Sequence, residues 1–261
     1  DEGKKVALLD FDGFNYYNEE DAAEGNPSTL STWENRGLNK MWNGIPTQSI
    51  FNFANSMEYA EAYADKVVVT GDVLDYISNG TISLMQRYIN KRYSDAMVVV
   101  GNHDPIRVMG LKTDVPDAGT VTSRYDLIQK SWNNDVYYTS EMVSEDVMII
   151  QLDNSQNKFW NSQIEKLTND LAEARENKYT VLLFMHEPIS TGDSADTAVP
   201  ALIATDDASL NFYNGSVIKS SANNDTATVI NLITSYGDVV KGIFAGHTHS
   251  DYYSEVHAKG G

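Results

Sequence analysis

An apolar run that stops at a glycine constrains this chain more than any other feature. Residues 98–100 are all valine, and Gly101-Asn102-His103-Asp104 follows directly. A continuous β-branched run is typical of a buried strand in a parallel sheet. The amide, imidazole and carboxylate that follow would then lie at the carboxyl end of the strand, where open α/β sheets bind ligands. Packing does not require three such side chains in a row, so the pattern predicts a binding site.

Four other apolar runs end in residue types that bind metals. These residues are Asp10 and Asp12 after residues 4–9, Asp72 after 67–70, His186 after 180–185, and His247 and His249 after 239–244. Parallel strands bring their carboxyl ends to one edge of a sheet, so residues distant in sequence would converge there. The chain has no cysteine, which excludes disulfides and thiolate metal sites. Imidazoles, carboxylates and an amide suit Mn, Fe, Zn or similar ions.

The apolar pattern predicts an α/β fold in a single domain over residues 1–261. We expect strands at 4–9, 67–70, 97–100, 147–152, 180–185 and 239–244, and helices at 47–64, 82–93, 162–176 and 228–236. The second and third strands with the helix between them would form a parallel βαβ unit. Residues 105–145 look less regular. We interpret residues 14–46 as an insertion beside the site, and residues 190–225 as a loop or lid.

Composition limits the partners of the protein. The formal net charge of −18 over 261 residues argues against nucleic acid as the main partner, because a phosphate backbone would be repelled. The longest apolar runs have the length of strands, so no transmembrane helix is expected. The chain starts at Asp1 without a signal-like segment, which fits a trimmed chain and a mature secreted protein equally well. Its acidic, cysteine-free composition favours secretion by a bacterium over a cytoplasmic location. The chain stops soon after the last ligand-type residues, which leaves open a longer native protein.

Four motifs in order resemble those of the calcineurin-like metallophosphoesterase family. They are Gly71-Asp72-Val73-Leu74-Asp75, Gly101-Asn102-His103-Asp104, a lone His186 after a strand, and Gly246-His247-Thr248-His249. The resemblance spans about residues 4 to 250. It implies an α/β sandwich of two sheets flanked by helices, with a two-metal site at the strand ends. The implied function is hydrolysis of a small-molecule phosphate monoester or diester.

The resemblance also implies a role for each motif residue. Asp72 would bridge two divalent ions, Asn102, His186 and His247 would complete one of them, and Asp10 and His249 would bind the other. His103 would contact the phosphate or protonate the leaving oxygen, and Asp75 would orient and polarise His103. A hydroxide that bridges the two ions would attack phosphorus directly, without a phosphoenzyme.

One residue departs from the family pattern. The first family motif is usually Asp-x-His, and here it reads Asp10-Phe11-Asp12. Asp12 would either ligate the ion and change the metal preference, or turn outward and leave that ion weakly held. The alternative to an enzyme is therefore a degenerate family member that binds a phosphorylated ligand or a protein without catalysis. The sequence predicts neither the substrate nor the oligomeric state.

Two further polar groups follow strands. We interpret Asp104 as a turn cap rather than as a residue that acts beyond the metals. Residues Asp153-Asn154-Ser155 close the strand predicted at 147–152. We interpret them as a loop cap.

Overall fold

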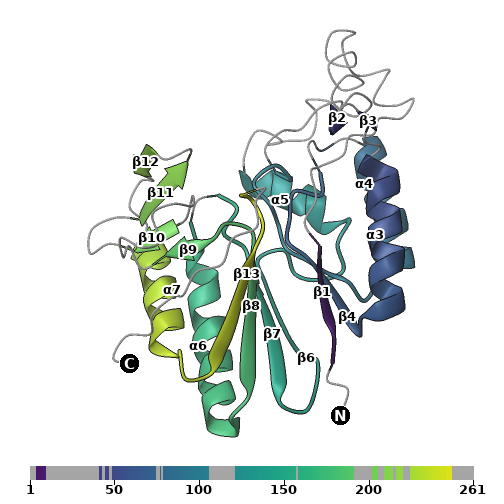
Figure 1. Ribbon diagram of the computed structural model, residues 1–261. Coiled ribbons are helices and arrows are strands. Elements are labelled where there is room, and N and C mark those ends of the chain that lie inside the picture. Colours follow the sequence, from purple (N-terminus) through teal and green to yellow (C-terminus); the bar gives the residue numbers. More distant parts are fainter. Residues whose placement is uncertain are drawn as a thin grey trace. The chain divides into compact units, whose positions relative to one another are not determined.

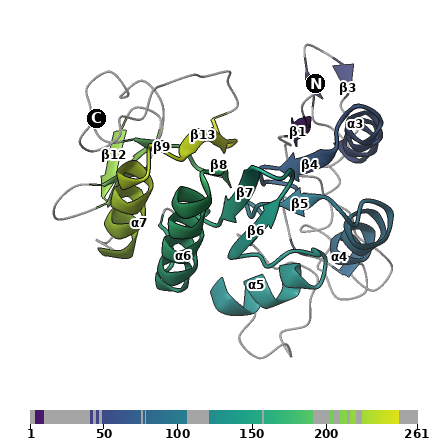
Figure 2. The same ribbon diagram turned by 90° about the horizontal axis from the view of Figure 1, so that it is seen from below.

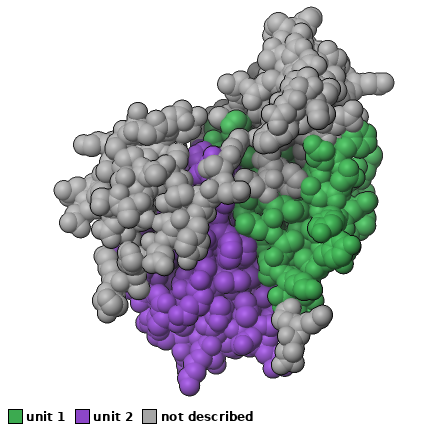
Figure 3. Space-filling model, viewed as in Figure 1, with its two compact units in different colours: residues 1–98, 102–136 green, residues 99–101, 137–261 purple. Residues whose placement is uncertain are grey.

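Parallel strands form the framework of both compact units into which the chain divides in this computed structural model (Figure 3). Unit 1 contains residues 1–98 and 102–136, and unit 2 contains residues 99–101 and 137–261. The structure describes residues 4–9, 41–42, 45–46, 49–74, 77, 79–105, 121–156, 158–190, 202–204, 209–213, 216–219 and 224–248. Each unit is an α/β structure with its own sheet and flanking helices, which confirms the predicted fold class at this level (Figure 1).

The sheet of unit 1 has three parallel strands. They are β1 (Val6–Leu9), β4 (Lys66–Val69) and β5 (Met97–Val98), in the order β1-β4-β5. All four residues of β4 are buried, as expected for a central parallel strand. The predicted βαβ unit is confirmed, because β4 and β5 are parallel neighbours with helical turns between them in sequence.

Helix α3 (Ser49–Tyr63) precedes β4 and places an apolar stripe in the core of unit 1. Phe53, Met57 and Ala60 follow the spacing of a helix face and are at most 3% exposed. The helix predicted from sequence at 47–64 is therefore confirmed. A short hairpin of β2 (Met41–Trp42) and β3 (Ile45–Pro46) comes before it in the chain.

The helix predicted at 82–93 changes its geometry halfway. It consists of α4 (Asn79–Met85) followed by a π-helical stretch, η1 (Gln86–Arg92). The Tyr93 amide donates to the Tyr88 carbonyl across five residues, at 2.8 Å. The Asn133 side chain donates to the carbonyls of Ile89 and Ser94, at 3.1 Å each. A side chain from outside the helix thus pairs a carbonyl within the wider turn.

Unit 2 contains a sheet in the order β13-β8-β7-β6. Strands β7 (Val147–Leu152), β8 (Thr180–Met185) and β13 (Val240–Ala245) are parallel, and β6 (Tyr138–Met142) runs antiparallel to β7. The three parallel strands end at the same edge of the sheet. The strands predicted at 147–152, 180–185 and 239–244 are confirmed.

Two helices pack on one face of this sheet, α6 (Asn161–Asn177) and α7 (Asn224–Ser235) (Figures 1 and 2). The apolar core between them and the strands is built from alternate strand residues and one stripe of each helix. It includes Met148, Ile150, Leu152, Val181, Leu183, Met185, Leu167, Leu171, Ala174, Val229, Ile230 and Ile233. Leu167 and Leu171 are fully buried, which confirms the inward face predicted for the helix at 162–176.

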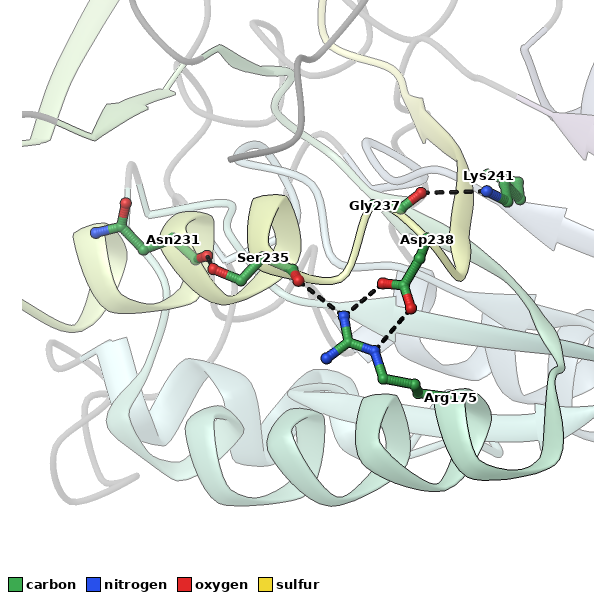
Figure 4. A network of polar contacts seen from close by, with 6 residues as sticks. All are labelled: Arg175, Asn231, Ser235, Gly237, Asp238 and Lys241. Atoms are coloured by element: carbon green, nitrogen blue, oxygen red, sulfur yellow. Dashed lines mark hydrogen bonds and ion pairs between the residues drawn. The ribbon is translucent and has the colours of Figure 1, made fainter. Parts of the chain in front are cut away.

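Polar contacts join α6 to the sheet and to α7. The Tyr138 hydroxyl donates to the Asp170 carboxylate at 2.6 Å, and burial together with this bond raises the pKa of Tyr138. At the other end of α6, Arg175 pairs with Asp238 and donates to the Ser235 carbonyl at 2.8 Å (Figure 4). Because this pair is exposed, it contributes little to stability.

Two sequence-based expectations differ from the structure. The stretch predicted as less regular contains α5 (Val121–Gln129) and β6. The stretch 190–225, expected to lack regular structure, contains β10 (Leu202–Ala204), β11 (Ser209–Tyr213) and β12 (Ser216–Lys219). These strands extend a second sheet of unit 2 with β9 (Ile189–Ser190), so a lid in this stretch stays a prediction. Among the described residues, no helix has both the length and the apolar character needed to cross a bilayer.

Candidate functional site

The loop after β4 carries Asp72 in a backbone conformation that few residues adopt. Gly71 has φ 103° and Asp72 has φ 54°. Glycine reaches the first value without a steric penalty, whereas Asp72 pays about 1–2 kcal/mol for the left-handed region. Asp72 is also only 5% exposed. A strained, buried carboxylate directly after a buried strand is a candidate functional group.

Hydrogen bonds in both directions join the Asp72 loop to residues His103 and Asp104 within unit 1. The His103 amide donates to Asp72 Oδ1 at 2.9 Å. The Asp72 and Leu74 amides donate to the two carboxylate oxygens of Asp104, at 3.2 and 2.7 Å. The position of Asp72 relative to His103 is thereby fixed from both sides.

Asp104 makes contacts that the sequence-based interpretation did not include. We expected it to cap its own turn, and its carboxylate accepts backbone amides of the loop that follows the neighbouring strand β4. Asp104 is fully buried. A buried carboxylate needs such partners, because its desolvation is otherwise costly. Asn102 and His103 on the same loop are partly exposed, which is compatible with a ligand approaching them.

In unit 2, His186 and His247 follow the parallel neighbours β8 and β13. His186 is fully buried, and His247 is partly exposed. The Gly246 amide donates to the His186 carbonyl at 3.0 Å, which joins the two loops. His247 has φ 69°, and the Thr248 amide donates to the Gly246 carbonyl across it at 2.8 Å. This is a γ-turn with positive φ, a rare and strained form.

The imidazoles of His186 and His247 each turn one ring nitrogen toward the other. His186 Nε2 and His247 Nδ1 lie 3.2 Å apart, and the rings are inclined by 73°. Two nitrogens that each lie about 2.1 Å from one ion are about 3.0–3.4 Å apart at angles between octahedral and tetrahedral. The distance between these nitrogens therefore fits two ligands of a single ion. Both histidines belong to the group of side chains that could hold a metal.

Helix ends do not account for the left-handed conformation of Asp72 and His247. Lys178, with φ 61°, is the other described non-glycine residue with positive φ, and it ends helix α6. A left-handed residue at a helix end is common, because it lets the last carbonyls find partners. Asp72 and His247 lie after strands instead. Their strain marks both loops as candidates for function.

Asn154 is a residue whose position the motifs did not reveal. It follows β7 and is fully buried. Its Oδ1 accepts the amides of His186 and Glu187 at 3.2 and 2.9 Å, and its Nδ2 donates to the Glu187 carbonyl at 2.7 Å. Asp153 meets the predicted role of a loop cap, because its Oδ1 accepts the Ser155 amide at 3.0 Å.

Several predicted site residues lie outside the described part of the chain. These are Asp10, Asp12, Asp75 and His249. Of the predicted site residues that the structure describes, unit 1 contains Asp72, Asn102 and His103, and unit 2 contains His186 and His247. Within unit 1 the structure brings Asp72 and His103 into contact, and within unit 2 it brings the two histidines into contact. A carboxylate, an amide and imidazoles without thiolates fit a divalent ion such as Mn, Fe or Zn.

Comparison with known proteins gives the relationship of the chain. Among solved structures, a dimetal phosphatase from Danio rerio is similar, with 13% identity and a TM-score of 0.46 over 94% of this chain and 82% of that one. A protein assigned as a 5'-nucleotidase from Staphylococcus aureus has 12% identity and a TM-score of 0.40 over 77% of this chain and 40% of that one. No curated protein sequence matches.

The sequence profile described as Calcineurin-like phosphoesterase matches residues 46–251. This range contains Asp72, Asn102, His186, His247 and His249, and it begins after Asp10 and Asp12. It covers well over half of the chain. The chain belongs to the calcineurin-like phosphoesterase family.

Proposed function

We propose that this protein is a metal-dependent phosphohydrolase that cleaves a phosphate monoester or diester. The observation that carries the proposal is the pair of ring nitrogens of His186 and His247, 3.2 Å apart at the ends of parallel strands. Two ring nitrogens at this distance can bind one cation, and they share a hydrogen bond when one of them carries a proton. Membership of a family of phosphoesterases supplies the reaction class.

The proposed ligands of one ion are Asp72, Asn102, His186 and His247. Asp10 and His249 would hold a second ion that Asp72 shares, with Asp12 as a further ligand. These assignments rest on the family motifs of the sequence. The left-handed backbone at Asp72 and His247 supports them, since strain of this kind persists where the surrounding structure fixes a residue for function.

The chain's own residues would orient the substrate and move its proton. Bound divalent ions would supply a water acidic enough to attack phosphorus and positive charge for the transferred phosphoryl group. His103 lies on the same loop as Asn102, and its amide donates to Asp72 at 2.9 Å, so the backbone at His103 is held next to the Asp72 carboxylate. We propose that its imidazole donates a proton to the leaving oxygen, and that Asp75 orients it.

Turnover of p-nitrophenyl phosphate and of its bis ester, with Mn²⁺, Fe²⁺ or Zn²⁺ added to metal-free protein, tests the proposal. We expect activity that depends on the ion. In His103→Ala the metal content should persist while turnover falls by about 10²–10⁴-fold, the usual share of a general acid. Activity of this variant close to that of the wild type would contradict the role of His103.

The same assay separates the enzyme from a degenerate family member. Asp12 in place of the usual histidine motivates that alternative. A protein that binds phosphate but turns over neither ester with any of the three ions would be a binding module. The ratio of the two turnover rates would show whether the active protein prefers monoesters or diesters.

A further inference from the structure

Asn154 holds the backbone at His186 through three hydrogen bonds of its side-chain amide. The side-chain oxygen accepts two successive amides, those of His186 and Glu187, and the nitrogen donates to the Glu187 carbonyl. An amide side chain offers both donor and acceptor atoms, so it can satisfy N–H and C=O groups of one loop together. No water can replace these bonds easily, because Asn154 is fully buried.

The position of Asn154 is itself fixed from helix α6. Its neighbour Asp153 is fully buried and accepts the indole N–H of Trp160 at 2.6 Å. Gln163 donates to the carbonyl of Asp153 at 2.9 Å and accepts the amide of Trp160 at 2.7 Å. The first turn of α6 therefore anchors the loop on which Asn154 lies.

From Asn154 the contacts continue to the imidazole pair. The His186 amide is bound by Asn154, and the His186 carbonyl accepts the Gly246 amide at 3.0 Å. Both backbone groups of His186 are thus held, one from the loop after β7 and one from the loop after β13. The His186 ring then meets His247 at 3.2 Å.

We infer that Asn154 is a positioning residue for the metal ligand His186. The inference rests on the proposed function, in which His186 and His247 bind one ion. Without Asn154 the His186–Glu187 backbone would lose three buried hydrogen bonds, and the imidazole would no longer be held where it meets that of His247. Partners that orient metal ligands typically change metal affinity about 10–100-fold when they are removed.

Asn134 provides a matched control in unit 1. Its Oδ1 accepts the Val98 amide at 2.9 Å, and its Nδ2 donates to the carbonyls of Val98 and Asp135 at 3.0 and 3.2 Å. It makes the same number of backbone bonds as Asn154, and it holds strand β5 rather than a ligand residue. Truncation of Asn134 removes the same kind of contact without reaching His186.

Isothermal titration of metal-free protein with Mn²⁺, with thermal unfolding of the same samples, tests the inference. We expect Asn154→Ala and Asn134→Ala both to lower the unfolding temperature. Asn154→Ala should also weaken Mn²⁺ binding by about 10–100-fold, whereas Asn134→Ala should bind as the wild type does. Turnover of Asn154→Ala should return toward the wild-type value when Mn²⁺ is raised to saturation.

If Asn154→Ala does not fold, Asn154→Ser keeps a hydroxyl that can accept one of the two amides, and a smaller loss of Mn²⁺ affinity is expected. Equal affinity of the wild type and the Asn154 variants would overturn the inference and leave the proposed function intact. Equal weakening in the Asn134 and Asn154 variants would show a general effect of stability and would also overturn it. A wild-type protein that binds no Mn²⁺, Fe²⁺ or Zn²⁺ would overturn the proposed function itself.

Discussion

The loop after β4 in unit 1 and the loop after β8 in unit 2 are each held by a buried polar side chain, but the two side chains differ in chemistry. Each carries a proposed metal ligand, Asp72 in the first and His186 in the second. Each is held by one fully buried polar side chain from the loop that follows the neighbouring strand, Asp104 in the first and Asn154 in the second. Asp104 is a carboxylate that accepts two amides, whereas Asn154 is an amide that binds two N–H groups and one carbonyl.

The difference between the two side chains follows from the backbone groups that each loop presents to them. Two N–H groups of the Asp72 loop donate to Asp104, and the two acceptor oxygens of a carboxylate suit them. The His186–Glu187 loop presents both N–H and C=O groups, and a carboxylate would face the Glu187 carbonyl with like partial charge. The two side chains are therefore not interchangeable, and substitutions that exchange donor and acceptor atoms test this directly.

Removal of the Asp104 carboxylate should have the largest effect on stability. In Asp104→Ala the Asp72 and Leu74 amides lose their partner, and each buried donor without a partner costs about 1–3 kcal/mol. Urea unfolding of the metal-free protein should show the loss. Asp104→Asn keeps one acceptor oxygen but turns an NH₂ group toward the second amide. It should therefore lose part of the stability that Asp104→Ala loses. Wild-type stability of Asp104→Ala would show that the two hydrogen bonds do not hold the loop.

Substitutions at two residues with positive φ, one in each unit, should change the stability of the protein in opposite directions. Gly71→Ala places a side chain at φ 103°, and strain of this kind costs about 1–3 kcal/mol. Lys178→Gly relieves the left-handed residue at the end of α6 and should stabilise the protein by up to about 1 kcal/mol, without changing turnover. Thermal unfolding of both variants measures the contrast. Destabilisation by Lys178→Gly would show that the backbone there is not strained.

A contact at the surface should matter least. The hydrogen bond from Arg175 holds the pKa of Asp238 below its ordinary value. Because the folded pKa is the lower one, the stabilisation is present at neutral pH and is lost as the pH falls through that pKa. Asp238→Asn should therefore unfold at a slightly lower temperature than the wild type at pH 7, and the difference should vanish in acid. A difference that persists in acid would mean that the contact acts through packing rather than charge.

The strands and the order of the motifs could be predicted from sequence, because the apolar patterns that indicate them are local. The apolar runs that form β4, β7, β8 and β13 and the helix face of Leu167 and Leu171 all follow simple periodicity. Positive φ at Asp72 and His247 could not be predicted, because only a few per cent of non-glycine residues adopt it, although aspartate and histidine do so more often than most.

The contacts of Asp104 and Asn154 were also hidden, because their partners lie about 30 residues away and depend on which strands are neighbours. A polar residue one or two positions after a buried strand was the available signal, and it also fits an ordinary turn. The π-helical turn at η1 depends on Asn133, which comes from another part of unit 1. The roles of all predicted site residues and the expected secretion stay predictions.

Anomalous diffraction from crystals grown with Mn²⁺ tests the central claim most directly. We predict a manganese peak in contact with the facing nitrogens of His186 and His247 and with the carboxylate of Asp72, and a second peak would show whether Asp12 is a ligand. Crystals that bind Mn²⁺ elsewhere and leave a hydrogen bond between the two imidazoles would contradict the proposed metal site.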